Sequence, residues 1–187
     1  MKNTAIVTGA SSGIGREISR VLVEMGYEVY GFGREFPEEE VYFHPIVCDL
    51  LNTPELERQI KEIRRRNDVS LLVNNAGVGY YGLHEELNVQ KIQKLVRTNL
   101  EVPMVLTNLL LRDLKKYSGT VINISSVTAQ LSNPHGCAYG ATKAGLTSFS
   151  HSLFDEARKY GVSVINIEPD MTDTNLYRNA DFTADDD

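Results

Sequence analysis

A tyrosine and a lysine four residues apart are the residues of this sequence whose spacing first suggests chemistry. The stretch GCAYGATKAGL, residues 136–146, sets Tyr139 and Lys143 among small side chains. On a helix, residues i and i+4 share one face, so the Lys143 ammonium can stand near the Tyr139 phenol. A nearby cation favours the phenolate and lowers the phenol pKa from its usual value of about 10. The pair predicts a tyrosine that exchanges a proton; the alternative is a coincidence on a helix surface.

A serine adds a second candidate group. Ser126 ends the apolar run INISS, residues 122–126, and its hydroxyl could hold a substrate oxygen and stabilise charge that develops there. Ser125 is adjacent and chemically identical. Strand alternation points the two side chains to opposite sides, which by itself leaves the choice between them open.

A glycine-rich stretch predicts a phosphate site. In TGASSGIG, residues 8–15, Gly9, Gly13 and Gly15 follow an apolar run and open a helix-patterned segment, with Ser11, Ser12 and Ile14 between them. Glycine permits the sharp turn and the close approach of a ligand, and the free N–H groups of a helix N-terminus attract a pyrophosphate. The strand-turn-helix context favours a dinucleotide site over a simple tight turn.

The end of the second apolar run bears on which dinucleotide binds. An NAD site usually carries an acidic residue about 20 residues beyond the glycines. Here GFGRE, residues 31–35, has Gly33 at that place and Arg34 next, followed by Glu35. An arginine can pair with a 2′-phosphate, so we expect NADP (NADPH) to be preferred over NAD, with a solvated surface arginine as the alternative.

Strand-like and helix-like segments alternate along the chain. Six runs rich in Val and Ile read as strands buried on both faces: 4–9, 28–33, 43–49, 69–75, 119–125 and 162–169. Helical patterns lie between them, with Gly26 closing the first helix, Thr53 and Pro54 as N-cap and first residue of the next, and a last helix over about 139–160. This alternation predicts an α/β fold, a doubly wound parallel sheet of about six strands in the order 3-2-1-4-5-6. Such a sheet binds ligands at the carboxyl ends of its strands, where these motifs fall.

Composition excludes several classes of protein. The chain of 187 residues is 42% hydrophobic and 24% charged, values typical of one soluble domain, and no stretch predicts a membrane span or signal peptide. A net charge of −6 argues against nucleic-acid binding. Cys48 and Cys137 form no CxxC pair, which fits the cytoplasm, and the four histidines show no ligand spacing, so we predict no metal site. We expect one nucleotide-binding domain over 1–177 and a disordered acidic tail over 178–187.

Four motifs in order resemble one family. TGASSGIG, NNAG at 74–77, INISS at 122–126 and YGATK at 139–143 are similar to the signatures of the short-chain dehydrogenase/reductase family, in its compact single-domain Rossmann branch. The resemblance runs from Thr4 to about Thr174. Alignment with the family against Tyr139 selects Ser126, rather than Ser125, as the counterpart of the family's serine.

The resemblance implies roles for further residues. It makes Ser126, Tyr139 and Lys143 the catalytic set, gives Lys143 contacts to the nicotinamide ribose, and assigns Asn99 to a water-linked proton relay. The cofactor contacts that it implies are Asp49, Leu50, Asn75, Ala76, Gly77, Pro169 and Thr174. Asp170 stands where the family usually has glycine, which puts the contact to the nicotinamide amide in question.

These observations predict an NADP-dependent oxidoreductase that moves a hydride between the nicotinamide and a carbonyl or secondary alcohol. The alternative is a dinucleotide-binding sensor with little turnover. Family members continue with a segment that covers the substrate, so we expect the C-terminal part of the usual fold to be absent here, and this chain to bind NADPH yet reduce carbonyls poorly. The resemblance also implies a homodimer or homotetramer that pairs through helices at about 99–115 and 139–160.

Overall fold

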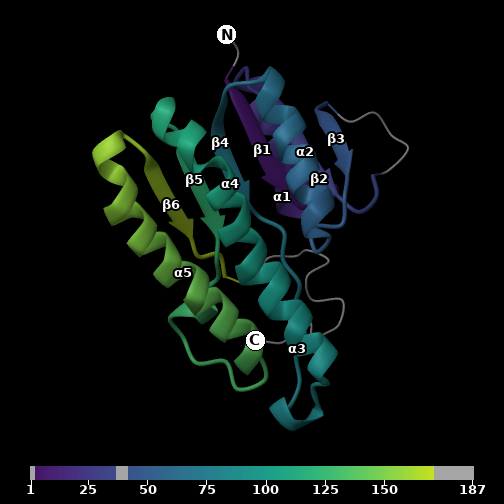
Figure 1. Cartoon of the computed structure of the whole chain (residues 1–187). Coiled ribbons are helices and arrows are strands. Elements are labelled where there is room, and N and C mark those ends of the chain that lie inside the picture. Colours follow the sequence, from purple (N-terminus) through teal and green to yellow (C-terminus); the bar gives the residue numbers. More distant parts are fainter. Residues whose placement is uncertain (1–2, 37–41, 171–187) are drawn as a thin grey trace.

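Six parallel strands form one sheet in the computed structural model, which describes residues 3–36 and 42–170. The strands are β1 (Thr4–Thr8), β2 (Glu28–Gly33), β3 (His44–Val47), β4 (Val69–Asn74), β5 (Thr120–Ile124) and β6 (Ser163–Ile167). Their order is β3-β2-β1-β4-β5-β6, and every neighbouring pair is parallel. The predicted doubly wound α/β fold and its strand order are therefore confirmed, and all strands end at the same edge of the sheet (Figure 1).

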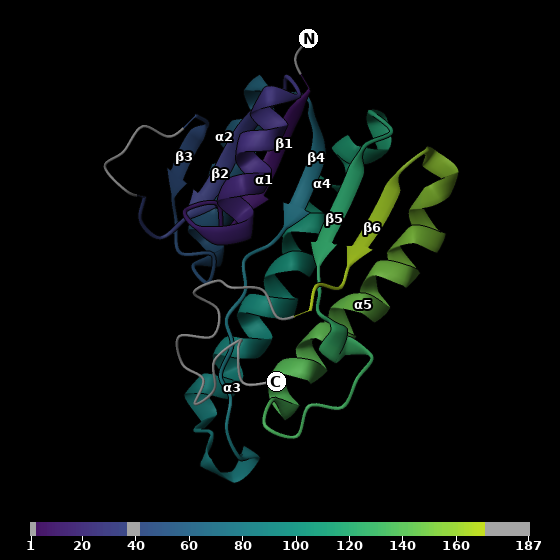
Figure 2. The ribbon, with the colours of Figure 1, turned by 180° about the vertical axis from the view of Figure 1, so that it is seen from behind.

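Helices cover both faces of this sheet. The helix α1 (Gly13–Glu24) lies on one face, as the view from behind shows best (Figure 2). The helices α2 (Thr53–Arg66), α4 (Val102–Lys116) and α5 (Cys137–Ala157) lie on the other face (Figure 1). A shorter helix, α3 (Val89–Val96), extends beyond the carboxyl edge of the strands. Each helix follows a strand along the chain, which is the pattern that right-handed crossovers produce.

The sheet separates two apolar cores. On the α1 side, Ala5, Val7 and Val29 of the sheet pack with Leu22 of the helix. On the other side a larger core joins sheet residues such as Ile6 and Val121 with residues of α2, α4 and α5, namely Leu56, Ile60, Ile63, Leu106, Leu110, Leu114, Leu153 and Ala157. Consecutive strand residues thus enter opposite cores, which explains the continuous apolar runs of the central strands.

The two edge strands differ from the prediction of full burial. In β3 the side chain of Val47 is 66% exposed, and in β6 Ile165 and Ile167 are 45% and 42% exposed. In the part of the chain that the structure describes, one face of β6 is open while α5 covers the other. The prediction was wrong for these strands because apolar runs in edge strands and in central strands look alike in sequence.

The ends of the helices mostly agree with their sequence signals. Gly26 follows α1 as predicted, and a 3₁₀ turn, Arg158–Tyr160, leads from α5 to Gly161. The cap of α2 was predicted one residue too late. Asn52 is the N-cap, because its side-chain oxygen accepts a hydrogen bond from the N–H of Glu55 at 3.4 Å, so Thr53 is already the first helical residue.

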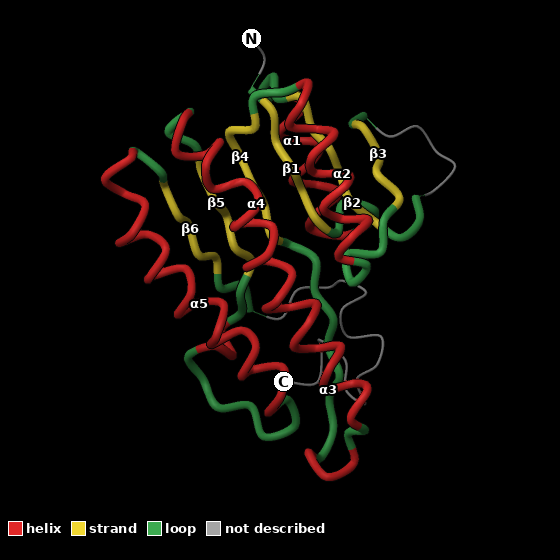
Figure 3. The backbone as a smooth tube through the Cα atoms, in the orientation of Figure 1, coloured by secondary structure: helices red, strands yellow, loops and turns green. Residues whose placement is uncertain are grey.

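A π-helical turn, Arg97–Glu101, joins α3 to α4, so that the two helices run on as one coil (Figure 3). Such turns often occur at functional sites. Within residues 3–36 and 42–170, none of the helices has the length and apolar character that crossing a bilayer requires. Thr174 and the predicted tail at 178–187 lie outside the described residues.

Candidate active site

A cavity of about 530 Å³ opens at the carboxyl ends of the strands. This volume is in the range of small-molecule and cofactor sites. Segments at the ends of all six strands form its wall. Of the predicted site residues, the wall contains Gly9, Ser11, Ser12, Gly13, Ile14, Arg34, Asp49, Leu50, Asn75, Ala76, Gly77, Ser126, Tyr139, Lys143 and Pro169. Gly15 and Asn99 lie behind the wall, and Thr174 is outside the described residues.

The glycine loop between β1 and α1 is shaped by close packing. Gly9 and Gly13 have φ angles of +66° and +51°, which L side chains rarely adopt. A Cβ on Gly15 would lie 2.2 Å from the carbonyl oxygen of Gly9 and 2.4 Å from Nδ2 of Asn75. These contacts leave no room for a side chain at the point where α1 meets the loop.

The N-terminus of α1 faces the same cavity. Ser12 is its N-cap, and among the described residues the Ser12 side chain makes no capping hydrogen bond to the helix. None of the first-turn residues of α1, all of which the structure describes, is acidic. The first N–H groups of a helix have no partner within it, so they are available to an anion here. The loop and the helix end therefore fit the pyrophosphate of a dinucleotide.

The end of β2 supplies a glycine and a cation. A Cβ on Gly33 would come within 3.0 Å of the Phe36 ring and of Cβ of Ser11, so an acidic side chain at this position would crowd both neighbours. Arg34 is exposed and lines the cavity. The guanidinium is thus free to reach an anionic group at the mouth of the cavity.

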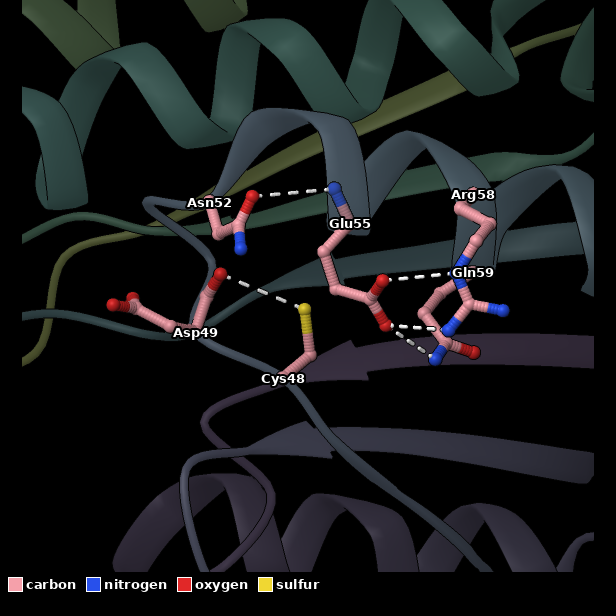
Figure 4. Close-up of polar contacts among 6 residues, drawn as sticks. All are labelled: Cys48, Asp49, Asn52, Glu55, Arg58 and Gln59. Atoms are coloured by element: carbon pink, nitrogen blue, oxygen red, sulfur yellow. Dashed lines mark hydrogen bonds and ion pairs between the residues drawn. The ribbon is translucent and has the colours of Figure 1, made fainter.

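The loop after β3 forms the next part of the wall (Figure 4). The Asp49 carboxylate accepts a hydrogen bond from the N–H of Leu51 at 3.0 Å, and the Cys48 thiol contacts the Asp49 carbonyl. Burial raises the pKa of the Cys48 thiol, so this cysteine is a poor nucleophile at neutral pH. Behind the loop, a hydrogen bond from Arg58 lowers the pKa of Glu55 to about 2 and holds the first turn of α2.

The loop after β4 is tied to the glycine loop by Thr8, a residue that the sequence analysis did not single out. The Thr8 hydroxyl accepts hydrogen bonds from the N–H groups of Asn75 and Ala76, both at 3.0 Å. The Asn75 amide donates to the carbonyl oxygen of Thr8 at 3.0 Å. The only sequence signal for Thr8 was its place at the strand end directly before Gly9.

Asn99 lies in the π-helical turn and binds the loop after β4 at Val78. Its side-chain oxygen accepts from the N–H of Val78, and its amide donates to the carbonyl of Val78, both at 2.9 Å. The amide also donates to the Thr142 hydroxyl at 3.2 Å. The position of Asn99 is thus that of a buried residue in a helix irregularity. Its part in a proton relay stays a prediction.

Ser126, Tyr139 and Lys143 meet on one side of the cavity. They are 7%, 3% and 4% exposed, although all three line the wall. Ser126 follows β5, and its oxygen accepts from the Thr128 N–H at 3.2 Å and from the Thr128 hydroxyl at 3.0 Å. Tyr139 and Lys143 come from the first turns of α5. The Tyr139 ring packs against the ring of Tyr81, with their centroids 5.5 Å apart.

The Lys143 ammonium lies between strand and tyrosine. It donates a hydrogen bond to the carbonyl of Ile124 at 2.8 Å and stands 5.7 Å from the centroid of the Tyr139 ring. Burial lowers the pKa of Lys143 to about 8. The ammonium is therefore mostly protonated at neutral pH, and its positive charge lies close to the tyrosine, as the spacing in sequence predicted.

The two adjacent serines point in different directions, as strand alternation predicted. The Ser125 hydroxyl is turned into α5, where it donates to the carbonyl of Lys143 at 3.0 Å and lies 2.9 Å from the Thr147 hydroxyl. Both serines line the cavity, but the Ser126 hydroxyl bonds to Thr128 and is not turned into α5. Beyond β6, Pro169 and Asp170 complete the wall.

Some residues of the wall were not predicted. Lys94 and Thr98, from α3 and the π-helical turn, line the cavity opposite the loop after β3. No motif marks them, since they reach the cavity only because the helical run passes this loop. Across residues 3–36 and 42–170, no group of three or more His, Cys, Asp or Glu side chains is arranged to hold a metal ion.

Comparisons with known proteins agree with this architecture. The family model described as short chain dehydrogenase matches residues 3–184. The serine 3-dehydrogenase of Agrobacterium fabrum is 34% identical over an alignment 183 positions long, which covers 93% of this chain and 74% of that protein. The NADPH-dependent 3-dehydrocapnine reductase of Ornithobacterium rhinotracheale is 32% identical over an alignment 191 positions long, which includes gaps and covers 94% of this chain and 68% of that protein. A short-chain dehydrogenase structure from Streptomyces avermitilis superposes with a TM-score of 0.85 at 33% identity, over 94% of this chain and 68% of that one.

Proposed function

The chain belongs to the short-chain dehydrogenase family and is an oxidoreductase, and from this premise we propose that it transfers a hydride between NADP(H) and a carbonyl or secondary alcohol. One observation carries the proposal. Ser126, Tyr139 and Lys143 line the same cavity as the glycine loop and the N-terminus of α1. A cavity that combines a proton-exchanging group with a dinucleotide cradle suits hydride transfer coupled to proton transfer.

The cofactor end uses mainly backbone groups of this chain. The N–H groups at the start of α1 and in the glycine loop would hold the pyrophosphate, and Asp49 and Leu50 would lie beside the adenine. Lys143 would hold the ribose next to the nicotinamide, beside the backbone of Gly77, where a Cβ would lie 3.7 Å from Nζ of Lys143. The bound nicotinamide supplies or takes up the hydride.

The choice of NADP over NAD rests on Gly33 and Arg34. An acidic side chain at position 33 would crowd Phe36 and Ser11, and an acid is the group that usually binds the free 2′-hydroxyl of NAD. The exposed Arg34 guanidinium on the cavity wall suits a 2′-phosphate. One relative, the 3-dehydrocapnine reductase, is named as NADPH-dependent, which is consistent with this choice.

The chemistry end works through side chains. The Lys143 ammonium stabilises the phenolate form of Tyr139, so that the phenol can give its proton to a carbonyl oxygen and the phenolate can take one from an alcohol. The Ser126 hydroxyl donates a hydrogen bond to the same substrate oxygen and stabilises the charge that develops on it. Asn99, through Val78, keeps the loop after β4 in place beside both groups.

The test is a turnover assay with the whole chain. NADPH is mixed with a panel of ketones, aldehydes, quinones and 3-oxoacyl-[acyl-carrier-protein], and NADP⁺ with serine, while cofactor absorbance is followed. We expect consumption of NADPH, or its formation, with at least one member, and loss of that activity in Ser126→Ala. Binding of NADPH without turnover of any panel member would contradict the enzyme.

A second candidate function is a dinucleotide-binding module with little turnover. Asp170 favours this second function, because it stands where the family usually has glycine and so puts the contact to the nicotinamide amide in question. Its carboxylate is exposed and lines the cavity beside Pro169. The variant Asp170→Gly separates the two. If Asp170 limits the binding of cofactor, the glycine variant gains NADPH affinity and turnover together; a module stays inactive in both forms.

The chain is also proposed to form homodimers or homotetramers through α4 and α5. Most of the apolar surplus of α4 is covered within the chain, since Leu109 and Leu111 pack against the core. Met104 of α4 and Phe154 of α5 remain 39% and 43% exposed, which supports a partner at this surface. Light scattering at micromolar concentration tests this, and a monomeric mass would count against it.

A further inference from the structure

Polar side chains, in addition to apolar ones such as Phe149, join the middle of α5 to the sheet. Asn74, Asn123 and Asn166 lie side by side in register on β4, β5 and β6. The Asn74 amide donates to Asn123 at 2.8 Å, and the Asn123 amide donates to the Ser150 hydroxyl of α5, also at 2.8 Å. Asn74, Asn123 and Ser150 are each at most 2% exposed. This contact depends on directional hydrogen bonds, so it fixes position more sharply than apolar packing does.

The Glu168 carboxylate is the acceptor on which this network ends. Its Oε1 accepts from the Thr147 hydroxyl at 2.8 Å, from the Asn166 amide at 2.9 Å and from the Gln130 amide at 3.4 Å. The Asn166 amide also donates to the Thr147 oxygen at 3.1 Å. Several donors therefore converge on one half-buried carboxylate, and hydrogen bonds to an ionised acceptor are stronger than neutral ones.

Glu168 also lies in the segment that flanks Ser126. Parallel pairing continues past the end of β6, because the N–H of Ser125 donates to the carbonyl of Ile167 at 2.7 Å and the N–H of Val127 donates to that of Pro169 at 3.2 Å. Glu168 is the residue between those two acceptors. Its backbone therefore sits opposite Ser126, while its side chain holds Thr147.

Thr147 connects this point to the rest of the site. It is one helical turn beyond Lys143 on α5, and its hydroxyl lies 2.9 Å from that of Ser125, which in turn donates to the Lys143 carbonyl at 3.0 Å. A change at Glu168 would thus reach Ser126 through the strand and reach Lys143 and Tyr139 through the helix.

We propose that Glu168 is a positioning residue, whose hydrogen bond to Thr147 sets the spacing between Ser126 on the β5 side and Tyr139 and Lys143 on α5. The inference rests on the proposed function. Removing the acceptor leaves the Thr147 and Asn166 donors without their carboxylate, and small displacements between reacting groups reduce rates strongly. The glycine loop and α1, which would hold the pyrophosphate, lie on the far side of β4, so most of the affinity for cofactor is expected to be spared.

The experiment compares Glu168→Ala with Glu168→Gln, which retains an acceptor oxygen. The readouts are kcat with the fastest member of the substrate panel, the Kd for NADPH by fluorescence, and thermal unfolding. We expect kcat to fall about tenfold in the alanine variant with an unchanged NADPH Kd, and to return close to the parent value in the glutamine variant. Thr147→Val and Thr147→Ser repeat the test from the other end of the contact, if Glu168→Ala does not fold.

Each possible result of this experiment either supports or overturns the positioning role of Glu168. An unchanged kcat in both Glu168→Ala and Thr147→Val, or a failure of the conservative variants to restore it, would overturn the positioning role. So would equal losses of kcat and NADPH affinity, since these would mark Glu168 as merely structural. If the parent chain turns over no member of the panel, the proposed function itself fails, and the positioning role falls with it.

Discussion

The two ends of the cavity differ in the groups that line them. At the cofactor end, between β1, β2 and α1, the wall consists of backbone and glycines, and a Cβ on Gly15 would lie 2.2 Å from the Gly9 carbonyl oxygen. At the chemistry end, between β5, β6 and α5, the wall consists of buried polar side chains, of which Lys143 is 4% exposed and Ser126 7%. We propose that the cofactor end binds its ligand through the shape of the main chain, and that the chemistry end acts on the substrate through positioned functional groups.

This difference predicts different responses to mutation. An added methyl group at the cofactor end deforms the backbone that we propose binds phosphate, so binding and stability should fail together. Removal of a functional group at the chemistry end leaves the backbone in place, so turnover fails while binding persists, except at Lys143, which would also hold the ribose of the cofactor. The variants below test whether the two ends can be separated in this way.

The largest effect is expected from Gly15→Ala. The new Cβ would press on the Gly9 carbonyl and the Asn75 amide, and so distort the glycine loop. Overpacking of this kind costs about 1–3 kcal/mol, so NADPH affinity should fall by about ten- to a hundredfold and the melting temperature should drop. Gly26→Asn at the other end of α1 is the control, because no atom lies within 4 Å of its Cβ and asparagine tolerates positive φ. Normal NADPH binding by Gly15→Ala would refute the close-packing argument.

Lys143→Met should abolish turnover and yet stabilise the fold at neutral pH. Burial lowers the pKa of Lys143 to about 8 in the folded chain, from a value near 10.5 in the unfolded chain. The buried positive charge therefore destabilises the folded chain at neutral pH. As pH rises from about 8 to about 10, the folded state loses this proton first, and the parent gains on the order of 2–3 kcal/mol relative to the variant. Denaturant unfolding of both chains at about pH 7 and about pH 10 measures the difference.

If the difference in unfolding free energy between the parent and Lys143→Met did not change with pH, the ammonium would not be held at a lowered pKa. Turnover in the parent should likewise fall as pH rises through about 8, because the cation beside Tyr139 is lost.

Arg34→Ala should act on one cofactor only. Loss of hydrogen bonds from a guanidinium to a phosphate weakens binding by about 1.5–3 kcal/mol, so NADPH affinity should fall at least about tenfold while NADH affinity stays the same. Arg20→Ala is the matched control, since Arg20 is an exposed arginine of α1 that pairs with Glu17 and Glu24. Equal losses of NADPH and NADH affinity would remove Arg34 as the group that reads the 2′-phosphate.

The smallest effect concerns the two free cysteines, of which only Cys48 lines the cavity. Cys137 begins α5 and is exposed, while Cys48 is buried in the wall after β3, where burial raises its thiol pKa. A thiol reagent should therefore label Cys137 rapidly and Cys48 slowly, and NADPH should slow the labelling of Cys48 further. Rapid labelling of Cys48 in the folded chain would contradict the packing of the loop after β3.

The sequence predicted the strand order and most of the residues that line the cavity, for a physical reason. Glycines at fixed spacing, a tyrosine and lysine on one helix face, and strands that alternate with helices all depend on local geometry. Their positions, including the strand order and the different directions of Ser125 and Ser126, followed from local rules together with the family resemblance.

The missed features depend on contacts between distant segments. Thr8 holds Asn75 across 67 residues of chain, and Glu168 meets Thr147 across 21. Nothing in the local pattern of a threonine or a glutamate marks such a contact. The exposure of Ile165 and Ile167 was missed for the same reason, because whether an apolar strand residue is covered depends on which helix packs over it.

The claim that turnover and cofactor binding depend on different ends of the cavity is tested most directly by Tyr139→Phe. Turnover and NADPH binding are measured on the same preparation. The ring and its packing against Tyr81 remain, and the hydroxyl with its exchangeable proton is removed. We predict that kcat falls by a factor of about 10²–10⁴ while the NADPH Kd by fluorescence titration is unchanged. Normal turnover by this variant, or a loss of NADPH affinity that matches the loss of kcat, would contradict the account.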